Sequence, residues 1–459
     1  MSEIAETKAD RMLHAELEVY MKKTAKSFEM HEETKKVVPG GIASDYQVMD
    51  PYPFFVADSK ATDIIDIDGN HLLDFHGGFG VTLFGYKHPH LVEAAIKLFA
   101  EQGSLISLPT TNLLPTATIL RERFTMPFWR FFSTGTEATL DAVRLARAMH
   151  CRKYIIKIES GYHGHHDAVW VSVHAGAREV DSSIPSQPFC SGIPKDVSDL
   201  TLIAEFNNLD SVQNYLNQYP GQVACVIVEP ILLNCSMIKP RDGFLQKLIE
   251  LCHSQQVLVI FDLVKINTAI NMKHIVKYWD SQNCGPDMYT LGKGLSGATC
   301  PVGAIGMTEE VAALIPQKVQ LSGTYCGNSF ALGMILATQQ YATEDRQDQL
   351  ESLSKHMYER CQEIITKYAL PAIVEYVGNK GCITFFKRGQ ELPYVRHYQD
   401  YIRNVDLVLE RLFTVFMFNR GLWVQPRDEW SISYQHTAED IEKFISIFKL
   451  FAQEIHEIK

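Results

Sequence analysis

Three short stretches of the chain combine residue types that can do chemistry together. The first, Thr134-Gly135-Thr136, follows an apolar pair and opens an amphipathic segment. At such a strand-to-helix turn, backbone N–H groups and hydroxyls attract a phosphate, and the helix dipole strengthens the attraction. The same residues are also typical of an ordinary helix N-cap. The turn is therefore a candidate phosphate site that needs support from other residues.

An aspartate and a lysine follow two further apolar segments. Asp262 directly follows Val257–Phe261, at a position where open α/β sheets bind ligands. Its carboxylate could hold the proton of a heterocyclic nitrogen, although a structural loop acid fits the pattern equally well. Lys293 lies between Gly292 and Gly294. A lysine in a confined site can act as a Schiff-base amine, whereas most lysines only face solvent.

In this chain order, the three features are the anchors that pyridoxal 5'-phosphate needs. The turn would fix the phosphate, Asp262 would hold the proton of the pyridine nitrogen, and Lys293 would form the Schiff base. The protonated ring is an electron sink for the carbanion left when a substrate loses its α-proton. Once the substrate amine displaces it, the lysine can carry that proton.

Short apolar runs that alternate with amphipathic stretches must position these residues. We expect four strands buried on both faces and helices between them. The strands are 154–158, 223–228, 257–261 and 288–291, and two of the helices are 137–149 and 243–252. This alternation predicts an α/β domain around a mostly parallel sheet.

The two ends of the chain predict a second, smaller domain. An amphipathic helix and an extended arm fill the first ~50 residues, and helical patterns cover residues 329–341, 347–368 and 438–459. Thr437 and Asp440 form a capping-box pattern before the last helix. We expect an N-terminal helix and arm (1–60), a large cofactor-binding α/β domain (61–330) and a C-terminal small α+β domain (331–459), with the arm joining the small domain.

Composition excludes several classes of protein. Of the 459 residues 46% are hydrophobic and 21% charged, and the net charge is -11 with no basic stripe, which argues against nucleic-acid binding. No apolar run approaches the ~18 residues that cross a bilayer, and no secretory signal is readable. Ten scattered cysteines fit reduced thiols. We therefore expect a cytoplasmic enzyme without a membrane or nucleic-acid partner.

Ordered motifs from about Val38 to Asp440 resemble those of the class III pyridoxal-phosphate aminotransferases of fold type I. The similar branch contains glutamate-1-semialdehyde aminomutase and related amino-acid aminotransferases. The motifs are Pro39-Gly40-Gly41, Asp66–Asn70, Leu73–Phe75, Gly85–Pro89, Phe132–Ala138, Gly161–Gly164, Val228–Pro230, Leu291–Lys293, Pro301–Ala304 and Ser322–Thr324. The resemblance implies fold type I: a large domain with a mostly parallel sheet between helices, and a smaller α+β domain from both chain ends.

The resemblance also implies roles for individual residues. Lys293 and Asp262 are implied as the Schiff-base lysine and the partner of the pyridine nitrogen. The implied cofactor contacts are Thr134, Gly135 and Thr136 at the phosphate, and Tyr162 and Val264 on the two faces of the ring. Thr324 matches a residue that reaches the phosphate of the neighbouring subunit, which implies an obligate homodimer with shared active sites. Glu229 matches an acid near the cofactor, or is a structural residue at a strand end.

The stretch after Asp262 departs from the family pattern. Relatives usually follow this aspartate with glutamate and valine, and then with Gly-x-Arg. Here Leu263, Asn267 and Ala269 replace the glutamate, the glycine and the arginine. We expect this change to alter the pocket more than the chemistry of the ring.

The N-terminal arm also departs from the family pattern. Where relatives that act on amino acids often hold the substrate carboxylate with an arginine, this chain has Gln47. Glutamine cannot form a charged fork, so Arg427 becomes the other candidate for a carboxylate, unless it only lies at the surface. The loss of the arm arginine favours an amine donor that is bulky, apolar or without a nearby carboxylate.

The predicted function is an aminotransferase that moves an amino group between an amine or amino acid and a keto acid. The alternatives are a glutamate-1-semialdehyde aminomutase-like mutase, a racemase or a decarboxylase on the same scaffold, and a binding module without activity. His163, His165, His166 and Asp167 form a metal-like cluster, but ligands so close in sequence cannot easily converge on one tetrahedral ion. No metal is expected.

Overall fold

The computed structural model describes residues 7–178, 184–279, 285–389, 394–424 and 429–456. The chain forms two compact units. The terminal unit consists of Met1–His88, Leu350–Leu392 and Val405–Lys459, and the central unit of Pro89–Gln349 and Pro393–Asn404.

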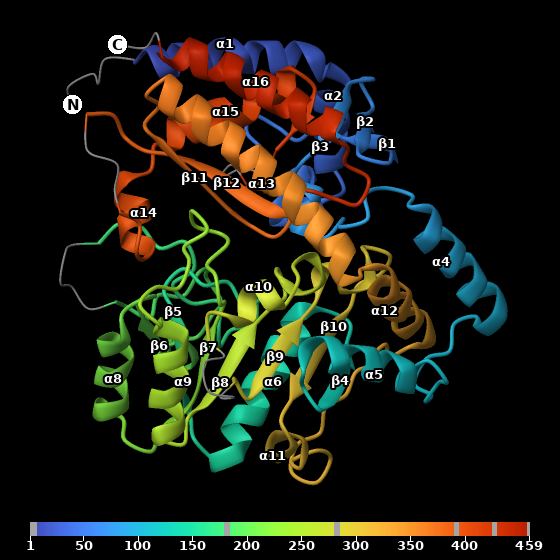
Figure 1. The fold of residues 1–459 in the computed structure, drawn as a ribbon, viewed down its shortest axis with the longest axis vertical. Helices are drawn as coiled ribbons and strands as arrows, with labels where there is room; N and C mark the ends of the chain where they lie inside the picture. Colours follow the sequence, from blue (N-terminus) through green and yellow to red (C-terminus); the bar gives the residue numbers. More distant parts are fainter. Residues whose placement is uncertain (1–6, 179–183, 280–284, 390–393, 425–428, 457–459) are drawn as a thin grey trace. The chain divides into compact units, whose positions relative to one another are not determined.

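A seven-stranded sheet forms the core of the central unit, in the strand order β4-β10-β9-β8-β7-β5-β6 (Figure 1). Its strands are β4 (Phe128–Phe132), β5 (Tyr154–Ile158), β6 (Thr201–Ala204), β7 (Val223–Val228), β8 (Leu258–Asp262), β9 (Met288–Leu291) and β10 (Gly303–Met307). Only β10 runs antiparallel to its neighbours, β4 and β9. The predicted α/β architecture with a mostly parallel sheet is confirmed.

The apolar runs of the sequence explain why this sheet is the core. All six residues of β7 are buried, as are all five of β8. Strands that are covered on both faces consist of nearly continuous apolar residues. The helix α6 (Gly135–His150) covers part of the sheet with Ala138, Ala142, Leu145 and Ala146, which are fully buried. These small and branched side chains let the helix pack closely against the strands.

The carboxyl ends of the parallel strands bring the chemistry-bearing residues to one edge of the sheet. Glu229 follows β7, Asp262 ends β8, and Lys293 comes two residues after β9. β4 runs parallel to β9, because both pair antiparallel with β10, so the turn at Thr134 reaches the same edge. Open α/β sheets bind ligands at this edge.

Further helices surround the sheet of the central unit. They include α4 (Pro89–Gln102), α5 (Leu113–Phe124), α8 (Leu209–Gln218), α9 (Phe244–Ser254), α12 (Ser329–Tyr341) and α14 (Tyr398–Asn404). α12 packs against both α4 and α5. No helix among the described residues is long and apolar enough to span a bilayer.

The terminal unit contains two small sheets and long helices. β1 (Val56–Lys60), β2 (Asp63–Asp66), β3 (His71–Asp74) and β13 (Leu422–Trp423) form one sheet, and β11 (Ala372–Val377), β12 (Lys380–Phe385) and β14 (Glu429–Ser431) form the other. The long helices are α1 (Lys8–Lys23), α2 (Ala25–Lys35), α13 (Glu344–Lys367), which starts in the central unit, α15 (Leu407–Asn419) and α16 (Ala438–His456). The N-terminal helix and the C-terminal elements therefore share one unit.

The last helix forms as its sequence predicts. Thr437 Oγ1 accepts a hydrogen bond from the backbone N–H of Asp440 (3.2 Å), and the Asp440 carboxylate accepts one from the N–H of Thr437 (2.8 Å). This is the predicted capping box. The apolar stripe of α16, which includes Phe444, Phe448 and Phe451, is buried.

The unit boundaries differ from the expected positions at 60/61 and 330/331. Residues 61–88 lie in the terminal unit because β2 and β3 complete a sheet with β1 and β13. Residues 331–349 lie in the central unit because α12 packs on α4 and α5. Hydrophobic periodicity predicts each helix but not the surface that it packs on, and that surface decides the boundary.

Candidate active site

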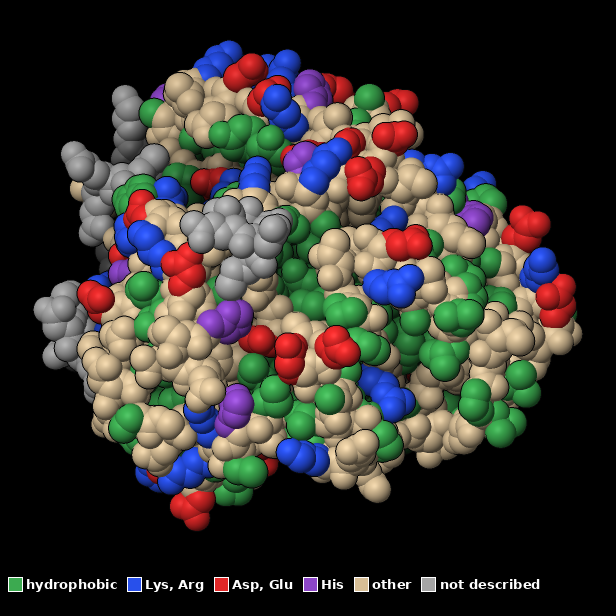
Figure 2. Space-filling model, turned by 60° about the horizontal axis from the view of Figure 1, so that its bottom comes forward, with side chains coloured by type: hydrophobic (Ala, Val, Ile, Leu, Met, Phe, Trp, Pro, Cys, Tyr) green, Lys and Arg blue, Asp and Glu red, His purple; other side chains and the backbone are tan. Residues whose placement is uncertain are grey.

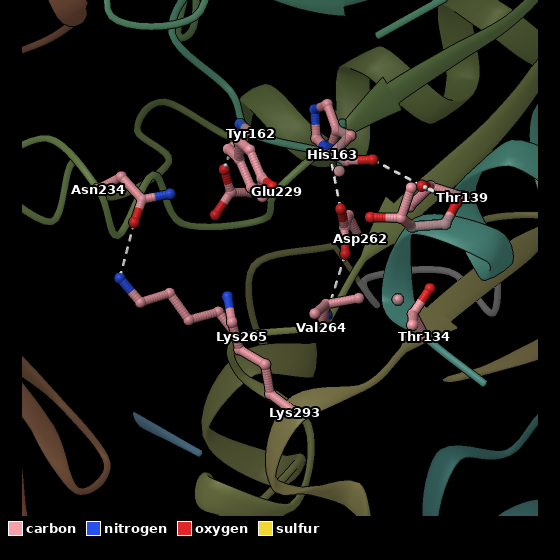
Figure 3. A pocket seen from close by; sticks show the side chains of 13 residues that line it. Thr134, Thr139, Tyr162, His163, Glu229, Asn234, Asp262, Val264, Lys265 and Lys293 are labelled. Atoms are coloured by element: carbon pink, nitrogen blue, oxygen red, sulfur yellow. Dashed lines mark hydrogen bonds and ion pairs between the residues drawn. The ribbon is translucent and has the colours of Figure 1, made fainter. Parts of the chain in front are cut away.

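A cavity of about 170 Å³ opens at the carboxyl edge of the central sheet (Figure 3). Eight of the residues predicted from the sequence line it. They are Thr134, Gly135, Thr136, Tyr162, Glu229, Asp262, Val264 and Lys293. Five further residues line it without having been assigned a role: Thr139, His163, Gly164, Asn234 and Lys265.

The N-terminus of α6 forms one wall of the cavity. Thr134 caps the helix, because its Oγ1 accepts a hydrogen bond from the N–H of Glu137 (3.1 Å). A side chain at Gly135 would place its Cβ 3.1 Å from both methyl groups of Val264, so only glycine allows this close approach without displacing Val264. The first N–H groups of a 16-residue helix therefore face the cavity beside two threonine hydroxyls, an arrangement that suits a phosphate.

Asp262 is held by three hydrogen bonds. Its Oδ2 lies 2.8 Å from Nδ1 of His163, and its Oδ1 accepts bonds from Thr290 Oγ1 and from the N–H of Val264, both at 3.0 Å. The side chain is 4% exposed. A carboxylate with such partners is fixed in orientation, as an acceptor for a cationic ring nitrogen needs to be.

His163 supports Asp262 from the side away from solvent. Its ring is buried, and burial lowers the pKa of the imidazole although Asp262 acts in the opposite direction. The neutral ring must carry its proton on Nδ1, since Asp262 can only accept. Among the described residues, Nε2 has no hydrogen-bond partner. His163 therefore acts on Asp262 through a single donated hydrogen bond.

Lys293 projects into the cavity from a strained backbone. Its φ of +46° lies in the left-handed region, which costs a residue with a Cβ about 1 kcal/mol or more. Asn267 holds the preceding residue in place, because its side-chain amide donates to the carbonyls of Gly292 (3.0 Å) and Val264 (2.7 Å). These bonds tie the Lys293 loop to the loop after Asp262.

Glu229 is the second buried acid of the cavity. Its Oε1 accepts a hydrogen bond from the N–H of Tyr162 (3.1 Å). Burial, with the charge of Asp262, raises the pKa of Glu229 to about 7, although Lys265 and Lys293 lower it. Glu229 therefore holds the loop that carries Tyr162 and changes its charge near neutral pH.

Lys265 is a second lysine of the cavity. Its side chain is buried, and its Nζ donates to Oδ1 of Asn234 at 2.8 Å. Asn234 lies on a turn after β7 that a bridge between Leu232 and Ile238 closes. Lys265 lies three residues after Asp262, and this position could have drawn attention to it in the sequence. Nothing in the sequence pairs Lys265 with Asn234.

Three predicted residues do not line this cavity. Thr324 is exposed, and its carbonyl accepts a bond from Ser107 Oγ at 3.1 Å. Gln47 lies in the terminal unit, where its Oε1 accepts a bond from the N–H of Ala43 (3.0 Å). Arg427 lies outside the described residues.

The three residues after Asp262 that depart from the family pattern are all buried. Leu263 is 0% exposed, and Ala269 packs in the core. Asn267, which replaces a glycine, forms the bonds that join the two loops. Asn267 therefore fixes the backbone under the cavity, and none of the three departing residues lines it.

The metal-like cluster of histidines does not converge on one point. His163 faces Asp262, whereas burial lowers the pKa of His166 to about 3 and His165 is exposed. The cavity fits pyridoxal phosphate instead. It offers a helix N-terminus for the phosphate, an oriented carboxylate for the ring nitrogen and a lysine amine, and Gly135 and Gly164 leave the space that side chains would fill.

The comparisons with known proteins agree with this fit. The model of the family described as "Aminotransferase class-III" matches residues 45–446. A curated glutamate-1-semialdehyde 2,1-aminomutase from Methanopyrus kandleri is 31% identical over 92% of this chain and 96% of its own. The region of similarity therefore includes both units and the whole cavity.

Two solved structures share the fold over nearly the whole chain. An omega-transaminase from Sphaerobacter thermophilus has a TM-score of 0.86 at 25% identity and covers 95% of this chain and 99% of its own. A glutamate-1-semialdehyde aminomutase from Pseudomonas aeruginosa PAO1, in complex with PMP, has a TM-score of 0.85 at 22% identity. It covers 96% of this chain and 97% of its own. Both support fold type I.

Proposed function

Because the chain belongs to the class-III aminotransferase family and depends on pyridoxal 5'-phosphate, we propose that it transfers an amino group from a bulky or apolar amine or amino acid to a keto acid. The observation that carries the proposal is the convergence of Asp262, Lys293 and the N-terminus of α6 on one cavity. These groups come from three strands that are far apart in sequence.

Most of the lining groups have a role in binding the cofactor. Thr134, Gly135 and Thr136 bind the phosphate at the N-terminus of α6. Asp262 holds the proton of the pyridine nitrogen, and His163 keeps the carboxylate oriented. Tyr162 and Val264 enclose the two faces of the ring, and Glu229 positions Tyr162 through its backbone N–H.

Pyridoxal phosphate supplies an electron sink for the carbanion left when a substrate loses its α-proton. The protein supplies the proton transfer. Lys293 would hold the cofactor through its Nζ, and the same amine would carry the proton that the substrate α-carbon loses. The left-handed backbone of Lys293, fixed by Asn267 through Gly292, aims this amine into the cavity.

The arm supports a bulky or apolar donor. Gln47 replaces the arginine with which relatives hold a carboxylate. Within the terminal unit, a cavity of about 630 Å³ is lined by Gln47 and by aromatic side chains, which include Phe54, Phe79 and Trp423. Cavities of this size and apolar lining accept an aromatic or long alkyl group.

The second candidate is a glutamate-1-semialdehyde aminomutase-like mutase or a racemase. It is favoured by the curated relatives, which carry the aminomutase name at 31–32% identity. Gln47 argues against it, because relatives often hold the carboxylate of an amino acid substrate with an arginine at this place in the arm, and glutamine cannot form a charged fork.

A panel of donors tests the proposed reaction. The cofactor-loaded protein is mixed with aryl and long-chain alkyl amines, with aromatic and with dicarboxylic amino acids, and with glutamate-1-semialdehyde. We expect aryl and alkyl donors to convert the cofactor to its pyridoxamine form fastest, with release of a carbonyl product. Isomerisation of glutamate-1-semialdehyde without a released carbonyl product would identify the mutase instead.

We also propose a homodimer in which Thr324 reaches the phosphate of the partner's cofactor. The support is an exposed apolar surface on the central unit, made of Val92, Ile96, Phe99, Leu105, Leu108, Leu113 and Leu114. Figure 2 shows hydrophobic side chains gathered at the right of the view, on the side where α4 lies in Figure 1. Ile96 and Leu114 are 66% and 76% exposed, which is costly unless a partner covers them.

The geometry of α4 fits a second copy as the partner. Val92, Ile96 and Phe99 recur at helical spacing on one stripe of the helix, while Leu91 is buried. Thr324 is connected to this surface through the bond between Ser107 and its carbonyl. Sedimentation equilibrium should give a dimer for the natural protein and a monomer for an Ile96→Asp/Phe99→Asp variant. A natural protein that is monomeric at micromolar concentration would refute the shared site.

A further inference from the structure

A buried lysine beside the cavity has no role in the proposed chemistry. Lys157 belongs to β5, is 0% exposed and does not line the cavity. Its Nζ donates to the carbonyl of Val171 at 2.7 Å, and within the part of the chain that the structure describes this is its one hydrogen bond. One neutral carbonyl does not compensate for the burial of an ammonium group, so Lys157 stays charged only if a nearby carboxylate balances it.

The register of the sheet places Lys157 on the face that carries the two acids of the cavity. Lys157 pairs with Ile227 of β7, and Ile227 pairs with Ile260 of β8. Paired residues of neighbouring strands point to the same face, and so do residues two apart along one strand. Glu229 comes two residues after Ile227, and Asp262 comes two residues after Ile260. The ammonium group therefore lies on the side of the sheet to which both acids point.

Glu229 is the acid whose charge is left for Lys157 to balance. Glu159 also lies near, two residues after Lys157, but its Oε1 lies 3.4 Å from Nε of Arg178 and accepts a bond from Gln399 at 2.8 Å. The charge of Glu159 is therefore already compensated. Glu229, in contrast, accepts its one hydrogen bond from the described residues through a backbone N–H and forms no ion pair with them.

The pKa values of the two groups agree with this pairing. Burial lowers the pKa of Lys157 to about 7, although Glu229 and Glu159 act in the opposite direction. Burial raises the pKa of Glu229 to about 7 as well. The other charged or titratable groups that face the pair are His163, Asp262, Lys265 and Lys293. Lys157 and Glu229 therefore change their charges in the same pH range, and the charged form of each favours the charged form of the other.

We propose that Lys157 is a positioning residue of the active site, whose buried ammonium group keeps Glu229 ionised. An ionised Glu229 holds the N–H of Tyr162 through a charge-assisted hydrogen bond, which is roughly twice as strong as a neutral one. Lys157 thereby fixes the loop that places Tyr162 against the ring, without touching the cofactor itself. This inference rests on the proposed function, because Tyr162 has that role only towards a bound cofactor.

The ionisation of Glu229 in the cofactor-loaded protein tests the assignment. Infrared absorption of protonated carboxyl groups is followed against pH, and Glu229→Gln identifies the contribution of Glu229. In Lys157→Met, which keeps the length of the side chain and removes its charge, we expect the pKa of Glu229 to rise by about 1 or more. Lys153→Met is the matched control, because Lys153 directly precedes the same strand but is exposed. It should leave the pKa of Glu229 unchanged.

A second measurement does not depend on the folding of a Lys157 variant. The Nζ of Lys157 is titrated by NMR in protein labelled with ¹⁵N-lysine, for the natural protein and for Glu229→Gln. Coupling between two sites is mutual. The pKa of Lys157 should therefore fall in Glu229→Gln by the amount by which the pKa of Glu229 rises in Lys157→Met.

The affinity for the cofactor tests whether Lys157 acts through Glu229. Lys157→Met should raise the Kd of pyridoxal phosphate by about 3-fold to 10-fold, as for the loss of charge from one hydrogen-bond partner. The same substitution made in Glu229→Gln should leave the Kd unchanged, because the acid on which it acts is gone. An equal rise in both backgrounds would show that Lys157 only supports the fold through Val171.

The assignment is also wrong if Glu229 titrates at the same pH in the natural protein and in Lys157→Met, or if Lys157 does so in the natural protein and in Glu229→Gln. Failure of the proposed function is a separate result. In that case the natural protein would transfer no amino group from any donor, while the two titrations, which need no transfer, would still report on the pair.

Discussion

Nδ1 of His163 lies 2.8 Å from Oδ2 of Asp262, and both side chains are almost completely buried. The ring follows the glycine turn after β5, whereas the carboxylate ends β8. Because the neutral ring donates and the carboxylate accepts, the pair fixes the direction in which Asp262 presents its charge.

Removal of this donor should weaken catalysis. We expect His163→Leu to lower kcat/KM by about 10-fold to 100-fold, which corresponds to the ~1.5–3 kcal/mol of a bond to a charged group. His163→Asn retains an N–H donor of similar reach and should lose much less. Steady-state kinetics with one donor and one acceptor measure both variants. An equal loss in the two variants would show that the volume of the ring matters and that the hydrogen bond does not.

Asn267 should stabilise the protein and position Lys293. Asn267→Ala removes two hydrogen bonds, to the carbonyls of Val264 and Gly292, from a buried position. We expect the free energy of unfolding to fall by about 1–3 kcal/mol, measured by urea denaturation. Asn217→Ala removes an exposed asparagine of α8 and is the control. Identical stability of the two variants would contradict the role of Asn267 in joining the loops.

The cofactor-free protein should lose stability with rising pH because of Glu229. Its folded-state pKa of about 7 lies above the ordinary value of 4.5, so the folded state holds a proton that the unfolded chain releases between these values. The contribution is complete below pH 4.5 and is lost as the pH rises through 7, by up to about 3 kcal/mol.

Urea denaturation at pH 5 and pH 8 checks this dependence. The stability difference between the two pH values should shrink in Glu229→Gln, which cannot ionise. Glu250→Gln, at an exposed glutamate of α9, should behave as the natural protein. A pH dependence that is the same in all three proteins would contradict the assignment to Glu229.

The sequence predicts the strands that position the site well, because the ends of these strands can be recognised in the sequence. The strands 154–158, 223–228 and 288–291 are confirmed with their predicted bounds, and 257–261 is shifted by one residue. Each is an apolar run long enough for one strand and buried on both faces, so its end is clear. Residues placed directly after such runs, such as Asp262, could therefore be assigned to one edge of the sheet.

Contacts between distant segments could not be predicted in this way. The bond of Asn234 to Lys265 joins loops that are 31 residues apart, and the bond of His163 to Asp262 spans 99 residues. Neither pair has a period or a spacing that marks it. The role of Asn267 was hidden for the same reason, because its bond to Gly292 depends on how two loops meet.

The attachment of the cofactor to one lysine is the most direct test of the account. The loaded protein is reduced with borohydride, digested and analysed by mass spectrometry. We predict that the added mass of the cofactor lies on Lys293 and that it is absent from Lys293→Ala, which should also fail to turn over. Added mass on Lys265, or on no lysine of the cavity, would contradict the central claim.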